Sequence, residues 1–176
     1  MSSRVPFPYK MKISKIFLLC ISIVLILAIG CSTKTENEET EKLVYAHAKA
    51  WETGDYGLID GILHKDIIFA YPGRRMNKQE TLKDFLDYNK SFENTKIYIN
   101  RIIVDGDDFA VEWQFASTNI KTAKRTAVSD AIIGNVRDGK IAVWKEYLDG
   151  RVGRMQAAGN LSLEEGQEPF PWPKKK

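Results

Sequence analysis

The chain has 176 residues, which is room for one domain once its two ends are set aside. Its 44% apolar and 11% aromatic residues are ordinary for a globular core and exclude a disordered chain. The formal charge of +3 is concentrated at one end: four of the 26 basic residues precede Cys31, which leaves 22 against 23 acidic residues. No clustered basic face appears apart from the lysines at 174–176, so nucleic acid is not an expected partner.

Cysteine and histidine are scarce. Cys31 is the last cysteine in the chain, so the domain behind it has neither a disulfide nor a thiol nucleophile. His47 and His64 are the only histidines, which argues against a zinc site built from His and Cys. The sequence also shows no glycine-rich phosphate loop and no cluster of metal ligands. We therefore expect neither a metal nor a cofactor.

The first thirty residues have the parts of a secretory signal peptide. A positively charged start is followed by an unbroken apolar stretch over 16–29 and by a small residue, Gly30, before Cys31. That stretch is shorter than the roughly 20 residues of a permanent membrane span. The segment Leu27-Ala28-Ile29-Gly30-Cys31 resembles the bacterial lipobox, in which the cysteine is lipidated and becomes the new N-terminus, although Ala28 stands where Leu is commoner. An uncleaved anchor or an ordinary signal peptide is the alternative.

These features predict how the chain is divided. Residues 1–30 are the signal peptide, with Met11 as the expected true start, and residues 31–41 are the lipidated Cys31 and a flexible tether. The domain covers 42–159, and the proline-containing residues 160–176 form an extended tail. The expected location is the cell envelope, anchored to the plasma membrane through Cys31. In a host with two membranes the outer one is permitted, because Ser32 is not the aspartate that retains some lipoproteins at the inner membrane.

Periodicity and turn signals predict an α+β order of elements. A helix that includes 43–51 ends at Gly54-Asp55, and a short helix covers 58–63. The elements that follow are a strand over 67–71, a helix that starts at Asn77 with Glu80 as its capping-box partner and includes Phe92 on one face, and strands over 96–104, 109–118, 125–136 and 140–148. Asp-Gly turns separate two pairs of these strands.

Five stretches in order resemble landmarks of the SnoaL-like and nuclear transport factor 2-like family. They are residues 51–55 (WETGD), 66–69 (DIIF), 105–111 (DGDDFAV), 138–141 (DGKI) and 144–149 (WKEYLD). The resemblance, which spans Glu41 to about Gly159, implies a cystatin-like α+β fold. In that fold a curved antiparallel sheet wraps around about three helices and forms a deep, mostly apolar, cone-shaped pocket. Many members form homodimers through the outer face of the sheet, so a homodimer is expected here.

The resemblance also bears on catalysis. Ketosteroid isomerases of this fold align without a gap from the first helix to Pro72, and their oxyanion-donating tyrosine falls on His47. Their aspartate base, just before the proline, falls on Tyr71. Without a carboxylate at Tyr71 the proton shuttle of those isomerases has no base, so steroid isomerisation by that route is not expected.

Three titratable residues are candidates for chemistry. His47 is either a general acid or base oriented by Asp130 or Glu146, or a buried histidine that bonds a neighbour or only lines the pocket. Asp130 lies mid-strand, either as that partner or in an outward ion pair with Arg125 or Arg101. An aspartate at about this place helps hold the oxyanion in the isomerases.

Glu146 shares a strand face with Trp144. It either reaches the cavity or, as we favour, pairs with a basic residue of a neighbouring strand. We expect the aromatic residues Trp51, Tyr71, Trp113 and Trp144 to contact a ligand, because the core and the pocket wall are partly one surface in this fold. Arg74 and Arg75 are expected near the rim, where they would meet an anionic ligand.

The function most consistent with these residues is a lipid-anchored module that binds a small, mainly apolar molecule. The missing isomerase base and the lack of a cofactor motif favour binding over catalysis. The alternatives are a pocket enzyme of the isomerase, dehydratase, cyclase or hydrolase type that uses His47, and a dimeric scaffold with a filled pocket and an apolar patch outside.

Overall fold

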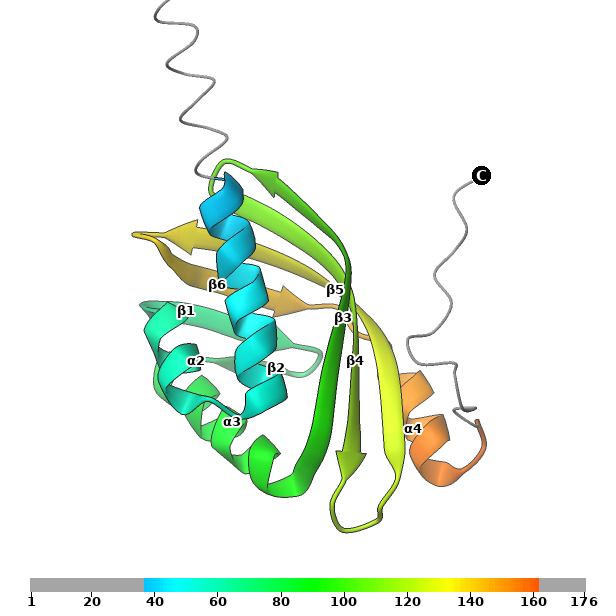
Figure 1. The fold of residues 1–176 in the computed structure, drawn as a ribbon. Coiled ribbons are helices and arrows are strands. Elements are labelled where there is room, and N and C mark those ends of the chain that lie inside the picture. Colours follow the sequence, from blue (N-terminus) through cyan, green and yellow to red (C-terminus); the bar gives the residue numbers. More distant parts are fainter. Residues whose placement is uncertain (1–36, 162–176) are drawn as a thin grey trace, which may run out of the picture. The chain divides into compact units, whose positions relative to one another are not determined.

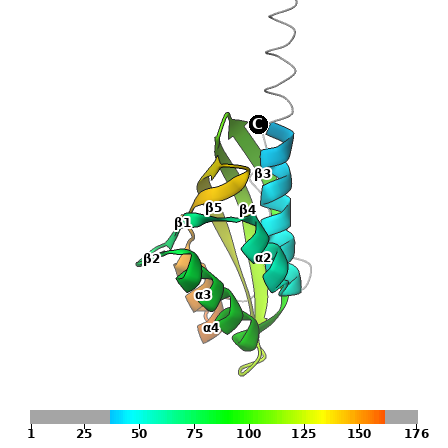
Figure 2. The same ribbon diagram turned by 90° about the vertical axis from the view of Figure 1, so that its left-hand side faces the viewer.

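The computed structural model describes residues 37–161. The predicted signal peptide, the lipidation site Cys31, most of the tether and the tail from residue 162 onward lie outside the described residues. Within them, helices lie against the concave side of one curved sheet (Figures 1 and 2). Among residues 37–161 no helix combines the length and the apolar character needed to cross a membrane.

The N-terminal helix is already formed at residue 37 and runs to residue 53. Residues 37–41, which we assigned to the flexible tether, are therefore helical. The reason is tertiary: Thr40 and Val44, one turn apart, are both buried. The helix ends at Gly54, whose φ of +68° suits glycine, and Asp55 caps α2 (Tyr56–Ile62) by accepting a hydrogen bond from the Leu58 amide.

The helix α3 (Lys78–Ser91) starts as the sequence predicts. Asn77 and Glu80 form the reciprocal capping box, each side chain accepting from the backbone amide of the other. Thr81, Leu82 and Phe85 are buried on one side of this helix. Phe92, which we placed on the helical face, instead begins the next strand.

The sheet has six strands in the order β2-β1-β6-β5-β4-β3. They are β1 (Leu63–Tyr71), β2 (Arg74–Met76), β3 (Phe92–Asp105), β4 (Asp108–Asn119), β5 (Arg125–Arg137) and β6 (Lys140–Glu146). The strand β2 was not predicted. The sheet is antiparallel, as expected, except for one pair: β1 runs parallel to β6. A parallel pair needs a long crossover, and here α3 and the strands β2 to β5 supply it.

The core is tightly packed where β4, β5 and β6 meet. Phe109, Gly134 and Trp144 lie side by side on these strands. A β-carbon on Gly134 would come within 2.1 Å of the Phe109 ring, so glycine allows this ring to cross β5 and reach Trp144, 5.7 Å away between ring centroids. Aromatic side chains therefore fill the space over this part of the sheet.

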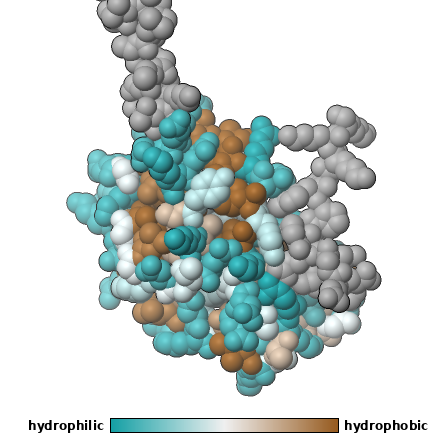
Figure 3. Space-filling view, in the orientation of Figure 1, coloured by the Kyte–Doolittle hydropathy of each residue, from teal (hydrophilic) through white to brown (hydrophobic). Residues whose placement is uncertain are grey.

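The helix α4 (Gly150–Ala158) follows β6 and packs against β5. The side chain of Gln156 in α4 accepts a hydrogen bond from the Ala127 amide at 2.8 Å, which fixes the helix to the strand. Figure 3 shows hydrophobic residues in several separate patches among hydrophilic ones on the face seen in Figure 1.

Candidate functional site

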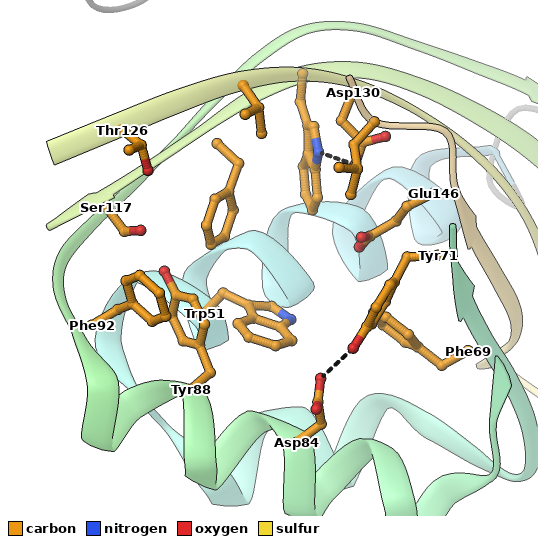
Figure 4. A pocket seen from close by; sticks show the side chains of 14 residues that line it. Trp51, Phe69, Tyr71, Asp84, Tyr88, Phe92, Ser117, Thr126, Asp130 and Glu146 are labelled. Atoms are coloured by element: carbon orange, nitrogen blue, oxygen red, sulfur yellow. Dashed lines mark hydrogen bonds between the residues drawn. The ribbon is translucent and has the colours of Figure 1, made fainter. Parts of the chain in front are cut away.

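A cavity of about 320 Å³ lies between the helices and the concave face of the sheet. Half of its lining residues are aromatic, and three are carboxylic acids. The lining residues are Trp51, Phe69, Tyr71, Asp84, Tyr88, Phe92, Trp113, Phe115, Ser117, Thr126, Val128, Asp130, Glu146 and Leu148 (Figure 4). A cavity of this size and character suits a small ligand with a large apolar part.

Three of the aromatic rings form what we call the aromatic corner: Trp51, Tyr88 and Phe115. Trp51 meets Tyr88 at 75° and Phe115 at 78°, and Tyr88 meets Phe115 at 66°. Their centroids are 5.1 to 6.4 Å apart, the range of edge-to-face packing. Rings at such steep angles do not stack upon one another, and all three border the cavity.

Asp130 lies on β5 with only 6% of its surface exposed. Its Oδ2 accepts from the Trp113 indole at 3.1 Å and its Oδ1 from the Tyr147 amide at 3.0 Å. Burial raises the pKa of its carboxyl to about 6, and these two donors restrain the rise. The outward ion pair considered as an alternative for Asp130 is therefore not formed.

Glu146 ends β6 and points into the cavity between Asp130 and Tyr71 (Figure 4). Its Oε1 accepts from the Trp144 indole at 2.9 Å. The favoured expectation of a basic partner is wrong: the ion pairs of the described residues involve other acids. Burial, and after it the charge of Asp130, raises the pKa of Glu146 to about 8. The two neighbouring carboxyls therefore hold a proton to higher pH than ordinary acids do.

The third carboxyl, Asp84 on α3, was missed in the sequence. Its Oδ1 accepts from Arg74 Nη1 at 2.6 Å, and its Oδ2 from the Tyr71 hydroxyl at 3.4 Å. Arg74 is thus engaged with an acid of the cavity wall rather than held ready for an anion. A signal was present, since Asp84 follows Thr81 by three residues and precedes Tyr88 by four on the inward side of the helix.

His47 does not line the cavity. It is fully buried, stacks on Trp144 at 3.9 Å between centroids, and its Nε2 accepts from the Trp51 indole at 3.2 Å. Burial lowers its pKa to about 3, so the imidazole is neutral. Among the described residues no carboxylate is bonded to it. The structure thus places His47 as a buried histidine bonded to a neighbour, without the carboxylate partner that its catalytic interpretation requires.

The four aromatic residues expected at the ligand divide between wall and core. Trp51, Tyr71 and Trp113 line the cavity, whereas Trp144 does not and has no exposed surface. Trp144 packs against His47 and Phe109 and, behind the cavity wall, against the lining residues Trp113 and Phe69, and its indole nitrogen donates to Glu146. Alternation along a strand indicates the face of a side chain, but not its depth along the cone.

In chemical terms, the cavity holds two carboxyl groups that resist ionisation, side by side. A protonated Glu146 can donate a proton or a hydrogen bond, and an ionised Asp130 can accept one. No group of residues in the described range 37–161 has the clustered His, Cys, Asp and Glu side chains of a metal site.

A curved sheet over helices with an apolar cone between them is the architecture of the nuclear transport factor 2-like proteins. The model of the SnoaL-like domain family matches residues 44–144, and the chain belongs to that family. No curated protein matches the chain.

Solved structures share the fold at low sequence identity. An LEH-like epoxide hydrolase from M. tuberculosis is 21% identical, with a TM-score of 0.62 over 69% of this chain and 91% of that one. A protein with a ketosteroid isomerase-like fold from Catenulispora acidiphila, solved in complex with trimethylamine, is 18% identical, with a TM-score of 0.61 over 66% and 92%. A candidate polyketide cyclase from Streptomyces antibioticus is 16% identical, with a TM-score of 0.60 over 67% and 97%. These similarities establish the fold.

Proposed function

We propose that this protein is a membrane-anchored lipoprotein whose SnoaL-like domain binds a small, mostly apolar molecule. The observation that carries the binding proposal is the cavity of about 320 Å³, in which nine of the fourteen lining residues are aromatic or aliphatic. Burial of a ligand's apolar surface there contributes about 25 cal/mol per Å² before the costs of binding. The trimethylamine complex of the Catenulispora acidiphila protein supports the same use of the fold.

Native mass spectrometry of the full-length protein, purified gently from its own host, tests the binding. We expect a retained small-molecule mass in the wild type and its loss in Val128→Phe, which fills the cavity. The matched control is Ser129→Phe, because Ser129 is the next residue of β5 and is exposed on the opposite face. An empty wild-type spectrum from folded protein, or equal retention by both variants, would contradict the proposal.

The membrane anchor rests on the sequence of the segment before the domain. Two or more acyl chains on Cys31 would hold the protein stably at a membrane, whereas one chain gives marginal binding. Cys31→Ala is expected to leave the membrane fraction, and Cys20→Ala, in the apolar run, is the matched control. Retention of Cys31→Ala in the membrane fraction would contradict lipidation.

A second candidate is an enzyme that transfers protons, and the pair formed by Asp130 and Glu146 is the observation that favours it. Two neighbouring acids with raised pKa values provide a proton donor and an acceptor in one apolar cavity. Such an enzyme would be of the isomerase, dehydratase, cyclase or hydrolase type. If the retained molecule is turned over, Glu146→Gln and Asp130→Asn should each lower kcat by about 100-fold or more. Unchanged turnover in both variants would exclude this role.

The scaffold alternative predicts a filled pocket, which the open cavity argues against. A homodimer is compatible with either other function. Ile103 and Ile133, 47% and 50% exposed, lie on one cross-strand row of the sheet through Ala110. Sedimentation at micromolar concentration is expected to show a dimer in the wild type and a monomer for Ile133→Lys. A monomeric wild type would contradict this proposal.

A further inference from the structure

The carboxyl groups of the cavity are not balanced by basic side chains. None of the fourteen lining residues is Lys or Arg. Arg74, at the wall, is paired with Asp84, so that acid is neutralised within the protein. Within the described residues, Asp130 and Glu146 receive hydrogen bonds from neutral donors, the two indoles and the backbone amides of Tyr147 and Ala131. The deep part of the cavity therefore holds the net negative charge of this pair.

An anion would meet that charge in an apolar cavity and would find no free guanidinium or ammonium group among the lining residues. A neutral apolar ligand would leave the charge of Asp130 desolvated without compensation. A cation would balance it. The charge of the site thus selects the ligand class more narrowly than its apolar area does.

The rest of the lining suits the substituents of an organic cation. The aromatic corner of Trp51, Tyr88 and Phe115 presents rings at 66° to 78° to one another in the same cavity as the acids. Aromatic faces attract ammonium groups through the ring quadrupole, and several rings around one site give the cages that bind quaternary ammonium ions. Carboxylates and rings together recognise both the charge and the alkyl groups of such an ion.

We propose that the cavity binds an organic cation, a tertiary amine or quaternary ammonium group on an apolar body, with the charged nitrogen between the aromatic corner and the pair Asp130–Glu146. This inference rests on the proposed binding function and specifies its ligand. The cation offsets the negative charge of Asp130 and favours ionisation of Glu146, and the apolar body fills the remainder of the cone.

The proposal predicts that binding releases a proton. The other titratable groups around Glu146 are Asp130 on β5, Tyr71 on β1 and Asp84 on α3, the last held by Arg74 on β2. His47, on the N-terminal helix, is separated from Glu146 by the Trp144 ring. Because the pKa of Glu146 is about 8, a cation that requires its carboxylate displaces the proton at neutral pH.

The test uses two probes of equal shape on the full-length protein in one non-ionic detergent. Benzyltrimethylammonium carries a permanent positive charge, and neopentylbenzene is its neutral carbon isostere. Calorimetric titration at pH 8 is expected to show binding of the cation at least about tenfold tighter than binding of the isostere. The affinity for the cation should fall as the pH is lowered from 8 to 6, by at most about tenfold per unit, because only the protein titrates.

Glu146→Gln keeps an acceptor for the Trp144 indole and removes the ionisable group. It should weaken binding of the cation about tenfold at pH 8, leave only the pH dependence that Asp130 contributes near pH 6, and keep the affinity for the isostere within about twofold. Asp130→Asn is the second variant and should also weaken binding of the cation but not of the isostere. The matched control is Glu112→Gln, since Glu112 lies on β4 next to Trp113 but outside the cavity lining, where it accepts from Asn100.

The outcomes separate the two proposals. Isostere affinity equal to or above that of the cation would overturn the cationic ligand and leave the apolar binding function standing. An equal loss of affinity for both probes in Glu146→Gln and Asp130→Asn would also overturn it, because the two acids would then only maintain the shape of the cavity. Binding of neither probe would contradict the cationic ligand, and an empty native spectrum beside it would contradict the binding function as well.

Discussion

Two sets of buried titratable groups meet at Trp144 and differ in what burial does for them. On one side His47 stacks on the indole ring, and on the other Glu146 accepts from the indole nitrogen, with Asp130 as its neighbour. Desolvation favours the neutral form of each group, so it lowers the pKa of the imidazole and raises that of both carboxyls. Only the carboxyls border open space. A shifted pKa therefore marks a candidate site only when the group can be reached by a ligand.

The largest change in stability should come from removing the Trp144 ring, which lies between the two sets of titratable groups. Trp144→Ala leaves a cavity beside His47 and Phe109 and is expected to lower the free energy of unfolding by about 3–5 kcal/mol. Urea unfolding followed by circular dichroism measures this loss. Tyr147→Ala, three residues along and 62% exposed, is the control and should change the stability by no more than about 0.5 kcal/mol.

The packed region around His47 and Trp144, which we call the closed side, should make the protein less stable in acid. Below pH 6.5 the unfolded chain protonates His47, whereas the folded chain does not until about pH 3. The unfolded state therefore binds more protons, and this group alone removes about 3 kcal/mol between pH 6.5 and 4. In urea unfolding across this range, the difference between wild type and His47→Leu should grow steadily in favour of the variant. Parallel curves would show that His47 is accessible to protons in the folded state.

Packing should also differ between the closed side and the cavity side. Gly134→Ala places a methyl group against the Phe109 ring and is expected to cost about 1–3 kcal/mol. Val128→Ile adds a methyl group to a cavity residue and should cost less than about 0.5 kcal/mol, because space is open there. Equal costs in thermal unfolding would mean that the cavity is closed in solution.

The cavity side is expected to lose stability as the pH rises. The folded-state pKa of Glu146, about 8, lies above its ordinary 4.5, so its contribution is fully present below pH 4.5 and is lost as the pH rises through 8. The loss is at most about 1.4 kcal/mol per pH unit, and solvation from the cavity reduces it. Glu146→Gln should lack this loss in urea unfolding between pH 5 and 8.5. A variant with the same slope as the wild type would assign the loss to another group.

Local signals in the sequence predicted the elements well. The capping box of Asn77 and Glu80 and the Asp-Gly turn at 138–139 involve residues a few positions apart, so their chemistry is readable without the fold. The parallel pairing of β1 with β6 is not local, because it depends on how five intervening elements return the chain. The same limit applied to the N-terminal helix, which extends to residue 37 because tertiary contacts bury Thr40.

The sequence predicted which types of residue form the site better than it predicted where each of them lies. Asp130, Trp51 and Trp113 border the cavity from mid-strand positions and from the inward face of the N-terminal helix. His47 and Trp144 lie on similar faces but deeper, where β-strand and helix alternation gives no information. Asp84 was missed, although an acid on the inward face of α3 was a readable anomaly.

The hydrogen bonds of the two tryptophans in the cavity wall have a spectroscopic consequence. The Trp51 indole donates to the sealed His47, whereas the Trp113 indole donates to the titrating carboxyl of Asp130. A cationic guest beside Asp130 must alter the electric field at the Trp113 indole, whereas His47, the acceptor of the Trp51 indole, stays neutral. Tryptophan emission is thus a built-in reporter of occupancy, and replacing Trp51 with Phe would leave Trp113 as the emitter at the cavity wall.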